Sequence, residues 1–191
     1  MFGGSRAGAA FRPLLFPASS WIIVFTAPVM EYAQVTYRLF VGSHPQTVDD
    51  IERLRRDLAI TAILNLQTDE DMATAGLDWK PLEVHYSTCP VVLFRVPMKE
   101  EQGEMREKLF QCISALEQLL SSGHTVYLHC TAGIGRSPTV AIGYLHHCMG
   151  WELNAAARYL KEVRKCSPHL EALGLAIVDQ ARLESADWWT M

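Results

Sequence analysis

The sequence predicts a single α/β domain, and three observations lead to that class. Segments of strand-like composition alternate with amphipathic helical patterns after Met30. The chain has 191 residues, of which 49% are hydrophobic, which suffices for one sizeable core and does not require two domains. A glycine-bearing loop stands between a short apolar segment and a helix whose first turn holds a proline. This alternation limits where an active site carried on loops can lie.

We expect two strands on either side of one helix in the first part of the domain. Residues 35–41 have the composition of a strand, which the turn residues 42–45 end. Thr47 is a typical N-cap for a helix over residues 48–58, because two aspartates follow it in the first turn. Residues 60–66 then form a buried strand.

The middle of the chain contains several prolines that limit its elements. Residues 67–81 are polar and rich in turn formers, so we expect a long loop with one short helix. Residues 82–86 and 91–96 each have the composition of a strand. A long helix follows, because apolar residues recur at helical spacing from Met105 to Leu120.

The last part of the chain is predicted to contain one strand and three helices. The strand spans residues 124–128, and a helix over residues 137–149 follows the glycine-bearing loop, with Pro138 in its first turn. Two further helices, over residues 153–164 and 170–186, complete the domain.

Charge and cysteine usage exclude several classes of function. The formal net charge is −4, so we expect no basic face of the kind that nucleic-acid binding requires. Five cysteines are an odd number, and their spacing matches neither a zinc site nor a dense disulfide framework. We therefore expect reduced thiols inside a cell and no bound metal.

Residues 1–30 differ in composition from the rest of the chain. They contain two arginines, no acidic side chain and an apolar stretch interrupted by Pro17 and Pro28. The stretch falls short of the roughly 20 continuous apolar residues that a membrane span needs, so no stable span is expected. The segment is an organelle transit segment, a gene start placed upstream of Met30 or, as the third alternative, a secretory signal, and we expect it to be poorly ordered.

The loop from His129 to Ser137 is the candidate for chemistry. Hydrolysis of a phosphoester through cysteine needs a thiolate, a cradle for the phosphoryl oxygens and positive charge at the transition state. Cys130 supplies the thiol, and the partial positive charge at the start of the next helix favours its thiolate form. Gly133 and Gly135 are free to adopt a positive φ. The backbone N–H groups that can form an anion-binding nest belong to Thr131, Ala132, Gly133, Ile134, Gly135 and Arg136.

Three side chains of the loop have further expected roles. Arg136 can place its planar guanidinium across two phosphoryl oxygens, a geometry that lysine could not reproduce. Ser137 is placed to donate a hydrogen bond to the sulfur when the sulfur becomes the leaving group. His129 is expected to fix the loop rather than to act as an acid or base.

This loop resembles the signature of the protein tyrosine phosphatase superfamily, in which His-Cys is followed by five residues and then Arg-Ser or Arg-Thr. The inner residues Thr131 to Gly135 are similar to the loop of the plant and algal glucan phosphatases, a branch of the dual-specificity group. Residues 41–46, 63–67 and 164–168 also look like segments of that branch. The resemblance implies one protein-tyrosine-phosphatase-like domain over residues 31–191, with a central mixed, mostly parallel sheet flanked by helices.

The chain departs from the family at the general acid. The family protonates the leaving oxygen with an aspartic acid some thirty residues before the cysteine, but no aspartate lies between Trp79 and Cys130. Matching the helix that follows places Glu100 at the acid position, and a glutamate offers the same carboxyl chemistry with one more methylene of reach. Glu101, Glu104 and an acid within residues 69–71 also stay open for this role, as does loss of the acid.

The resemblance implies a cysteine-dependent dual-specificity phosphatase that hydrolyses phosphomonoesters through a phosphocysteine intermediate and needs no cofactor. The substrate is either a phosphorylated glucan, which the inner loop residues favour, or a phosphoprotein. The alternative function is a binding module that recognises phosphate and turns it over poorly. We expect a location in the cytoplasm, or in the chloroplast if residues 1–30 are a transit segment, and the sequence leaves the oligomeric state open.

Overall fold

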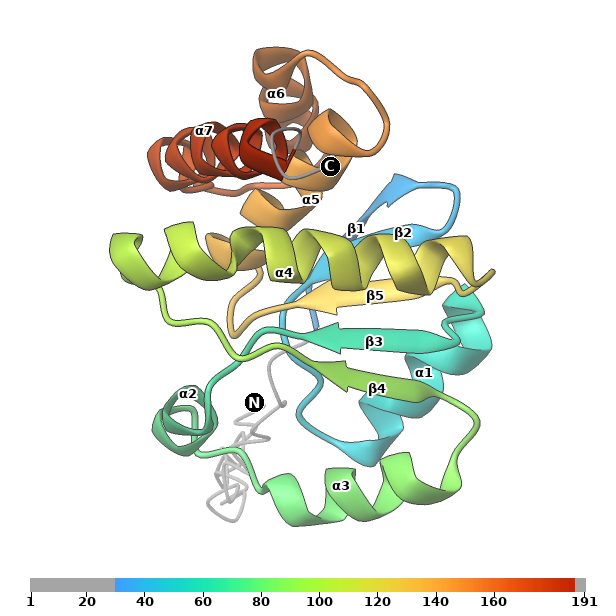
Figure 1. The fold of residues 1–191 in the computed structure, drawn as a ribbon. Coiled ribbons are helices and arrows are strands. Elements are labelled where there is room, and N and C mark those ends of the chain that lie inside the picture. Colours follow the sequence, from blue (N-terminus) through green and yellow to red (C-terminus); the bar gives the residue numbers. More distant parts are fainter. Residues whose placement is uncertain (1–29, 188–191) are drawn as a thin grey trace, which may run out of the picture.

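The computed structural model describes residues 30–187. The segment interpreted as a transit segment or gene start therefore lies outside the described residues, apart from Met30. A five-stranded sheet forms the centre of the described part, and helices cover both of its faces (Figure 1). The predicted α/β class with one mixed, mostly parallel sheet is confirmed.

The sheet has the strand order β1-β2-β5-β3-β4. Its strands are β1 (Tyr32–Thr36), β2 (Leu39–Gly42), β3 (Ala62–Asn65), β4 (Val92–Arg95) and β5 (Val126–His129). Among them only β1 and β2 pair antiparallel. The prediction of a single strand over residues 35–41 is wrong, because the chain reverses at Tyr37 and Arg38 to form a hairpin. Tyr37 is 89% exposed at this turn, so its aromatic character did not indicate a buried strand position.

Seven helices surround the sheet in the described part of the chain. They are α1 (Val48–Leu58), α2 (Asp69–Thr74), α3 (Trp79–Thr88), α4 (Gln102–Ser121), α5 (Arg136–His147), α6 (Leu153–Val163) and α7 (Leu170–Asp187). The predicted N-cap of α1 is confirmed, because Thr47 and Asp50 form a reciprocal capping box. None of the helices described within residues 30–187 combines the length and the apolar character that crossing a membrane requires.

The prediction of a strand over residues 82–86 is wrong, because these residues lie in α3. Pro81 occupies the first turn of this helix, where a backbone N–H has no partner within the helix in any case. Trp79, Leu82 and Tyr86 follow one another at spacings of three and four residues and belong to one apolar cluster. The helical spacing of these three side chains outweighs the strand propensity of Val84 and Tyr86.

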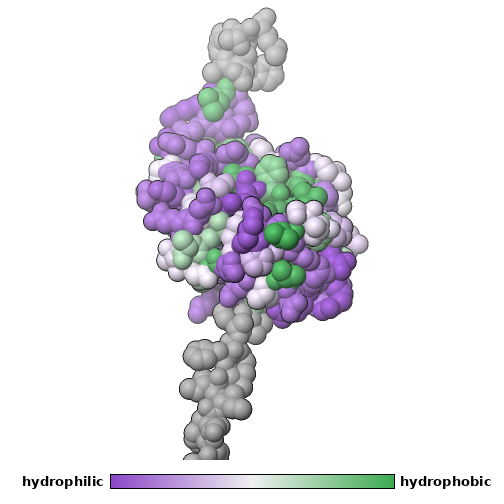
Figure 2. Space-filling model, turned by 90° about the horizontal axis from the view of Figure 1, so that it is seen from below, coloured by the Kyte–Doolittle hydropathy of each residue, from purple (hydrophilic) through white to green (hydrophobic). Residues whose placement is uncertain are grey.

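Side chains alternate along the strands between two apolar clusters. Leu64 and Leu128 lie in the larger cluster, to which α4, α5, α6 and α7 contribute. Ile63 and Tyr127 point to the opposite face and lie in the smaller cluster with residues of α1 and α3. Figure 2 shows the molecule from the α3 side, where apolar groups are scattered over a largely hydrophilic surface. The central strands are therefore buried on both faces, which fixes their register.

The carboxyl ends of the four parallel strands meet at one edge of the sheet (Figure 1). His129 at the end of β5 aligns with Gly42 of β2 and with Asn65 of β3, and Asn65 aligns with Arg95 of β4. The loops that follow these strands therefore lie together, and ligands of open α/β sheets bind at such an edge.

Candidate active site

The Cys loop, residues 129–137, connects β5 to α5 at this edge. Every carbonyl group from Cys130 to Gly135 accepts a hydrogen bond on the outside of the loop. The donors and distances are His129 Nδ1 to Cys130 (3.0 Å), the His44 N–H and Nδ1 to Thr131 (3.0 and 2.8 Å), Arg164 to Ala132 (3.1 Å) and Gly133 (2.8 Å), the Ser167 N–H to Ile134 (2.9 Å), and the Thr139 hydroxyl to Gly135 (2.9 Å).

The arrangement of the carbonyls determines where the loop amides point. In a trans peptide the C=O of one residue and the N–H of the next point in opposite directions, and no cis peptide occurs in the described chain. The N–H groups from Thr131 to Arg136 therefore face the centre of the loop. None of these six donates to an acceptor among residues 30–187. A ring of unpaired donors around one point is a site for a tetrahedral oxyanion.

The two loop glycines serve different purposes. Gly133 has φ of +70°, as the sequence predicts, and a Cβ there would lie 2.4 Å from the backbone C and O of Gly42. Gly135 has φ of −102°, so it does not use the freedom to adopt a positive φ. A Cβ at Gly135 would lie 2.2 Å from Oε1 of Glu100. A side chain at Gly135 would therefore displace the ends of the Glu100 and His169 side chains, while its backbone conformation is open to other residues.

Cys130 lies at the base of the loop and is 3% exposed. Its Sγ is 3.4 Å from the hydroxyl oxygen of Ser137, the partner expected from the sequence. Two further thiols lie outside the loop: burial raises the pKa of Cys112 to about 12 and that of Cys148 to about 11. Those two thiols stay protonated at neutral pH, which leaves them poor nucleophiles.

Arg136 is held by two partners outside the loop. Its NH1 and NH2 groups donate to the two carboxylate oxygens of Asp71 at 2.6 and 3.1 Å, and NH1 also donates to the carbonyl of Met98 at 2.8 Å. The Nε–H of Arg136 is buried and has no acceptor among the described residues. An unpaired buried donor costs about 1–3 kcal/mol, so this group is available to an anion in the loop.

Asp71 lies within the acidic segment 69–71 that could have supplied the general acid, and its contacts oppose that role. Burial alone would raise the pKa of Asp71, but the hydrogen bonds from Arg136 and from Thr68 outweigh it and hold the pKa below its ordinary value. The carboxylate is therefore ionised at neutral pH. It fixes the direction of the Arg136 guanidinium, a role that no sequence motif indicates.

Glu100 lies beside the loop, with one carboxylate oxygen 3.0 Å from Nε2 of His169. Glu104 is less suited to give a proton, because hydrogen bonds from Lys108 and from the Lys99 N–H hold its pKa below the ordinary value. Glu100 and Glu101 both line the cavity over the loop, which has a volume of about 540 Å³. The lining is completed by Thr68, Glu70, Asp71, Thr74, Ala75, Lys99, Thr131 and Arg136.

His129 is fully enclosed beneath the loop. Burial lowers the pKa of His129 to about 3, although the hydrogen bond with the Cys130 carbonyl acts in the opposite direction. The imidazole is therefore neutral at neutral pH. This environment agrees with a role in fixing the loop, which stays a prediction.

Residues that orient the loop were missed by sequence reasoning. His44 and Arg164 hold three of its carbonyl groups, yet they lie 86 and 34 positions from Cys130 and no spacing rule connects them to it. The only signal was that the two residues lie in segments 41–46 and 164–168, which resemble the glucan phosphatase branch.

Trp79 has an indole ring of the kind that can stack on a sugar ring. In this structure it packs on Tyr86 and under Arg95, and it does not line the cavity over the Cys loop.

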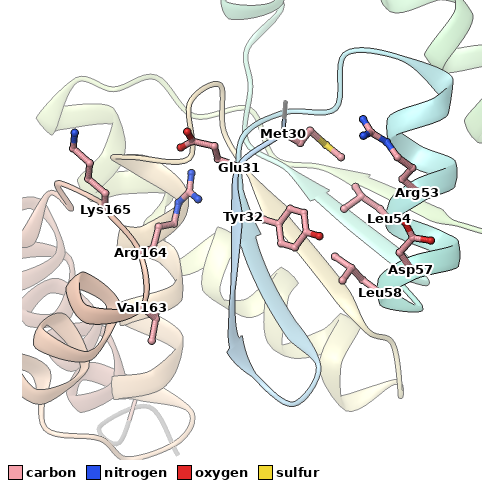
Figure 3. Close-up of a pocket in the computed structure, with 10 residues that line it drawn as sticks. All are labelled: Met30, Glu31, Tyr32, Arg53, Leu54, Asp57, Leu58, Val163, Arg164 and Lys165. Atoms are coloured by element: carbon pink, nitrogen blue, oxygen red, sulfur yellow. The ribbon is translucent and has the colours of Figure 1, made fainter. Parts of the chain in front are cut away.

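A second cavity, of about 530 Å³, lies between α1, β1 and the end of α6 (Figure 3). It is lined by Met30, Glu31, Tyr32, Arg53, Leu54, Asp57, Leu58, Val163, Arg164 and Lys165. No residue of the Cys loop lines it. Arg164 contacts both this cavity and the loop, but its Nε and NH2 groups are used by the loop carbonyls. We therefore place the candidate active site at the Cys loop.

Comparison with known families agrees with this fold and loop. Residues 39–173 match the family model described as the dual specificity phosphatase catalytic domain, so the chain belongs to that family. The predicted family resemblance is confirmed.

Among curated proteins, the chain is similar to the phosphoglucan phosphatase LSF1, chloroplastic, of Arabidopsis thaliana, with 32% identity over 78% of this chain and 25% of that protein. It is 29% identical to mouse laforin over 71% of this chain and 44% of laforin. It is 31% identical to the phosphoglucan phosphatase DSP4, amyloplastic, of Castanea sativa over 74% of this chain and 38% of that protein. The chain thus matches less than half the length of these relatives. The crystal structure of PTPMT1 shares the fold, with a TM-score of 0.63 and 20% identity over 81% of this chain and 99% of that one.

Proposed function

We propose that this protein hydrolyses phosphomonoesters, with Cys130 as the nucleophile and a phosphocysteine intermediate. The observation that carries the proposal is the ring of six inward backbone N–H groups around the Cys130 thiol, completed by the unpaired Nε–H of Arg136. Hydrogen bonds to the loop carbonyls hold these donors in place, and fixed donors stabilise charge on the phosphoryl oxygens with little reorganisation.

The reaction takes two steps. The Cys130 sulfur attacks phosphorus as the P–O bond to the leaving group breaks, and Glu100 gives a proton to the leaving oxygen. A water molecule then attacks the phosphocysteine, its proton goes to the Glu100 carboxylate, and the S–P bond breaks. Ser137, 3.4 Å from the sulfur, donates a hydrogen bond to the departing thiolate. Arg136 binds the phosphoryl oxygens in both steps.

For the substrate, we favour a phosphorylated glucan over a phosphoprotein. Two of the similar proteins are named phosphoglucan phosphatases. The cavity over the loop is lined by the carboxylates of Glu70, Glu100 and Glu101, which can accept hydrogen bonds from sugar hydroxyls. The described part of its lining contains no aromatic side chain. Sugar recognition would then rest on hydrogen bonds and not on stacking.

A phosphate-binding module with poor turnover is the second candidate. The observation that favours it is Glu100, which stands in place of the family's aspartate and is engaged by His169. For the location, the relatives named as chloroplastic and amyloplastic support a plastid, with the cytoplasm as the alternative.

The test is phosphate release from phosphorylated starch and from a phosphotyrosine peptide by the wild type, Cys130→Ser and Glu100→Gln. We expect release from starch by the wild type, none by Cys130→Ser, and a loss of about 100-fold or more for Glu100→Gln. Release from the peptide but not from starch would contradict the glucan preference. Phosphate binding by a wild type that hydrolyses neither substrate would favour the binding module.

A further inference from the structure

A second titratable group lies beside the expected proton donor. Nε2 of His169 is 3.0 Å from Oε1 of Glu100. A Cβ atom on Gly135 would stand 2.2 Å from that oxygen and 2.7 Å from that nitrogen. The Glu100–His169 pair therefore occupies the space that the glycine leaves open, directly on the Cys loop.

Thr139 ties this pair to the loop. Its hydroxyl donates to the carbonyl of Gly135 at 2.9 Å and accepts the backbone N–H of His169 at 2.8 Å. The hydroxyl is in a fully buried residue of α5. One side chain thus fixes both a loop residue and the backbone of His169, the residue whose imidazole contacts Glu100.

The contact allows the two groups to share one proton. Either a carboxylic acid donates to a neutral imidazole, or an imidazolium donates to a carboxylate, and each state contains one proton. An isolated exposed carboxyl group loses its proton well below neutral pH, whereas imidazoles retain theirs to higher pH. A pair of this kind can supply a proton under conditions in which a lone carboxylate cannot.

Charged groups of both signs lie on the elements that flank the pair. They are Arg136 on α5, Lys99 and Glu101 in the same loop as Glu100, Glu104 and Lys108 on α4, and Glu171 on α7. Arg136 is neutralised by Asp71, and Lys108 is paired with Glu104.

We propose that His169 is the positioning and proton-sharing partner of Glu100, an inference that rests on the function proposed above. When the P–O bond breaks, Glu100 gives the shared proton to the leaving oxygen. If that proton resides on His169, it moves to Glu100 in the same step, so the pair ends as a carboxylate and a neutral imidazole. The water that attacks the phosphocysteine returns one proton to the pair, and Cys130 leaves as a thiolate.

The test compares His169→Gln with the wild type on two substrates across pH. Glutamine retains a donor for Glu100 but cannot carry the proton. An alkyl phosphate has a poor leaving group and needs the proton, whereas nitrophenyl phosphate needs it little. We expect kcat on the alkyl phosphate to fall about tenfold above neutral pH. The alkaline limb of the plot of kcat against pH should move to lower pH. On nitrophenyl phosphate, the rate of the first step, measured from the burst of nitrophenolate in the first turnover, should stay within about twofold.

The chain offers a matched control in a second histidine–glutamate contact. His85 Nε2 on α3 lies 2.9 Å from Glu52 Oε1 on α1, and neither residue lines the cavity over the Cys loop. His85→Gln should keep wild-type rates and pH limbs on both substrates. A wild-type pH profile for His169→Gln would overturn the proposal, and so would an equal loss on both substrates, which indicates damage to the loop. A wild type inactive on every ester would contradict the proposed function itself.

Discussion

At the scale of single residues, the Cys loop shows how distant side chains produce a binding site. The six carbonyls from Cys130 to Gly135 are held by donors from the end of β5, from the β2–α1 connection, from α5 and from the segment after α6. Each outward hydrogen bond turns the next N–H inward. The proposed affinity for an oxyanion therefore depends on side-chain and backbone groups that hold the loop from outside.

The burial of the His129 imidazole can be tested through the pH dependence of the free energy of unfolding. Its pKa is about 3 in the folded protein, where burial disfavours the charged form, and about 6.5 for an unfolded chain. The unfolded state thus binds more protons between these values, and stability falls as pH drops from about 6.5 toward 3. Urea unfolding should show a loss of about 2 kcal/mol from this group between pH 6.5 and 5. His129→Asn should lack that part of the slope, and an equal slope in both proteins would contradict the assignment.

Asp71 is predicted to act on substrate binding through Arg136. Asp71→Asn keeps an oxygen for the Thr68 cap but removes the charge that fixes the guanidinium, so we expect KM to rise about tenfold with a smaller change in kcat. Steady-state kinetics and inhibition by inorganic phosphate measure this effect.

Asp69→Asn is the matched control for Asp71→Asn. Asp69 is in the same helix, its side chain is 87% exposed and it pairs with Arg95 instead of Arg136. Equal KM values for the two variants would show that Asp71 does not position Arg136.

At the scale of elements, helical periodicity and capping were readable from sequence, whereas turns inside β-rich segments were not. Thr47 and the apolar repeat of α4 predicted their helices because both signals are local. Residues 82–86 were misassigned because side chains of α3 pack against α1 and the sheet, a contact that strand propensity does not report. Cys130, Arg136 and Ser137 could be placed from one motif. His169 and Arg164 could not, because their relation to the loop exists only in the fold.

Gly133 is the loop position where a side chain is least tolerable. Its positive φ and the backbone atoms of Gly42 at 2.4 Å leave no room for a methyl group, and backbone cannot move aside as a side chain does. Gly133→Ala should displace the backbone N–H groups that point into the loop. We therefore expect kcat/KM to fall about 100-fold or more. Gly103→Ala in α4 is the control, since nothing lies within 4 Å of a Cβ there. Near-normal activity of Gly133→Ala would contradict the amide-nest geometry.

At the scale of the whole molecule, the sheet separates two apolar clusters, and the larger one supports the Cys loop from below. Cys130 belongs to that cluster together with residues of α4, α5, α6 and α7. The packing of α5 on α4 is especially close, because a Cβ on Gly143 would lie 2.5 Å from Cδ1 of Ile113. Helix packing and the position of the loop are thus parts of one core.

A double-mutant cycle can test this close packing. Ile113→Ala should cost about 2–5 kcal/mol, since Ile113 is 1% exposed. Gly143→Ala should cost about 1–3 kcal/mol in the wild type through overpacking. It should cost much less in Ile113→Ala, where the two atoms nearest to the added methyl group are gone. Urea unfolding measures all four proteins, and additive changes would contradict the packing described for α4 and α5.

The most direct test of Cys130 as the nucleophile is to locate the phosphoryl group during turnover. The wild type is mixed with a radiolabelled phosphomonoester, quenched in denaturant within one turnover and digested, and the labelled peptide is sequenced. A phosphocysteine mechanism predicts label on Cys130, transfer of that label to inorganic phosphate at the turnover rate, and no label in Cys130→Ser. Label on another residue, or phosphate release by Cys130→Ser at the wild-type rate, would contradict it.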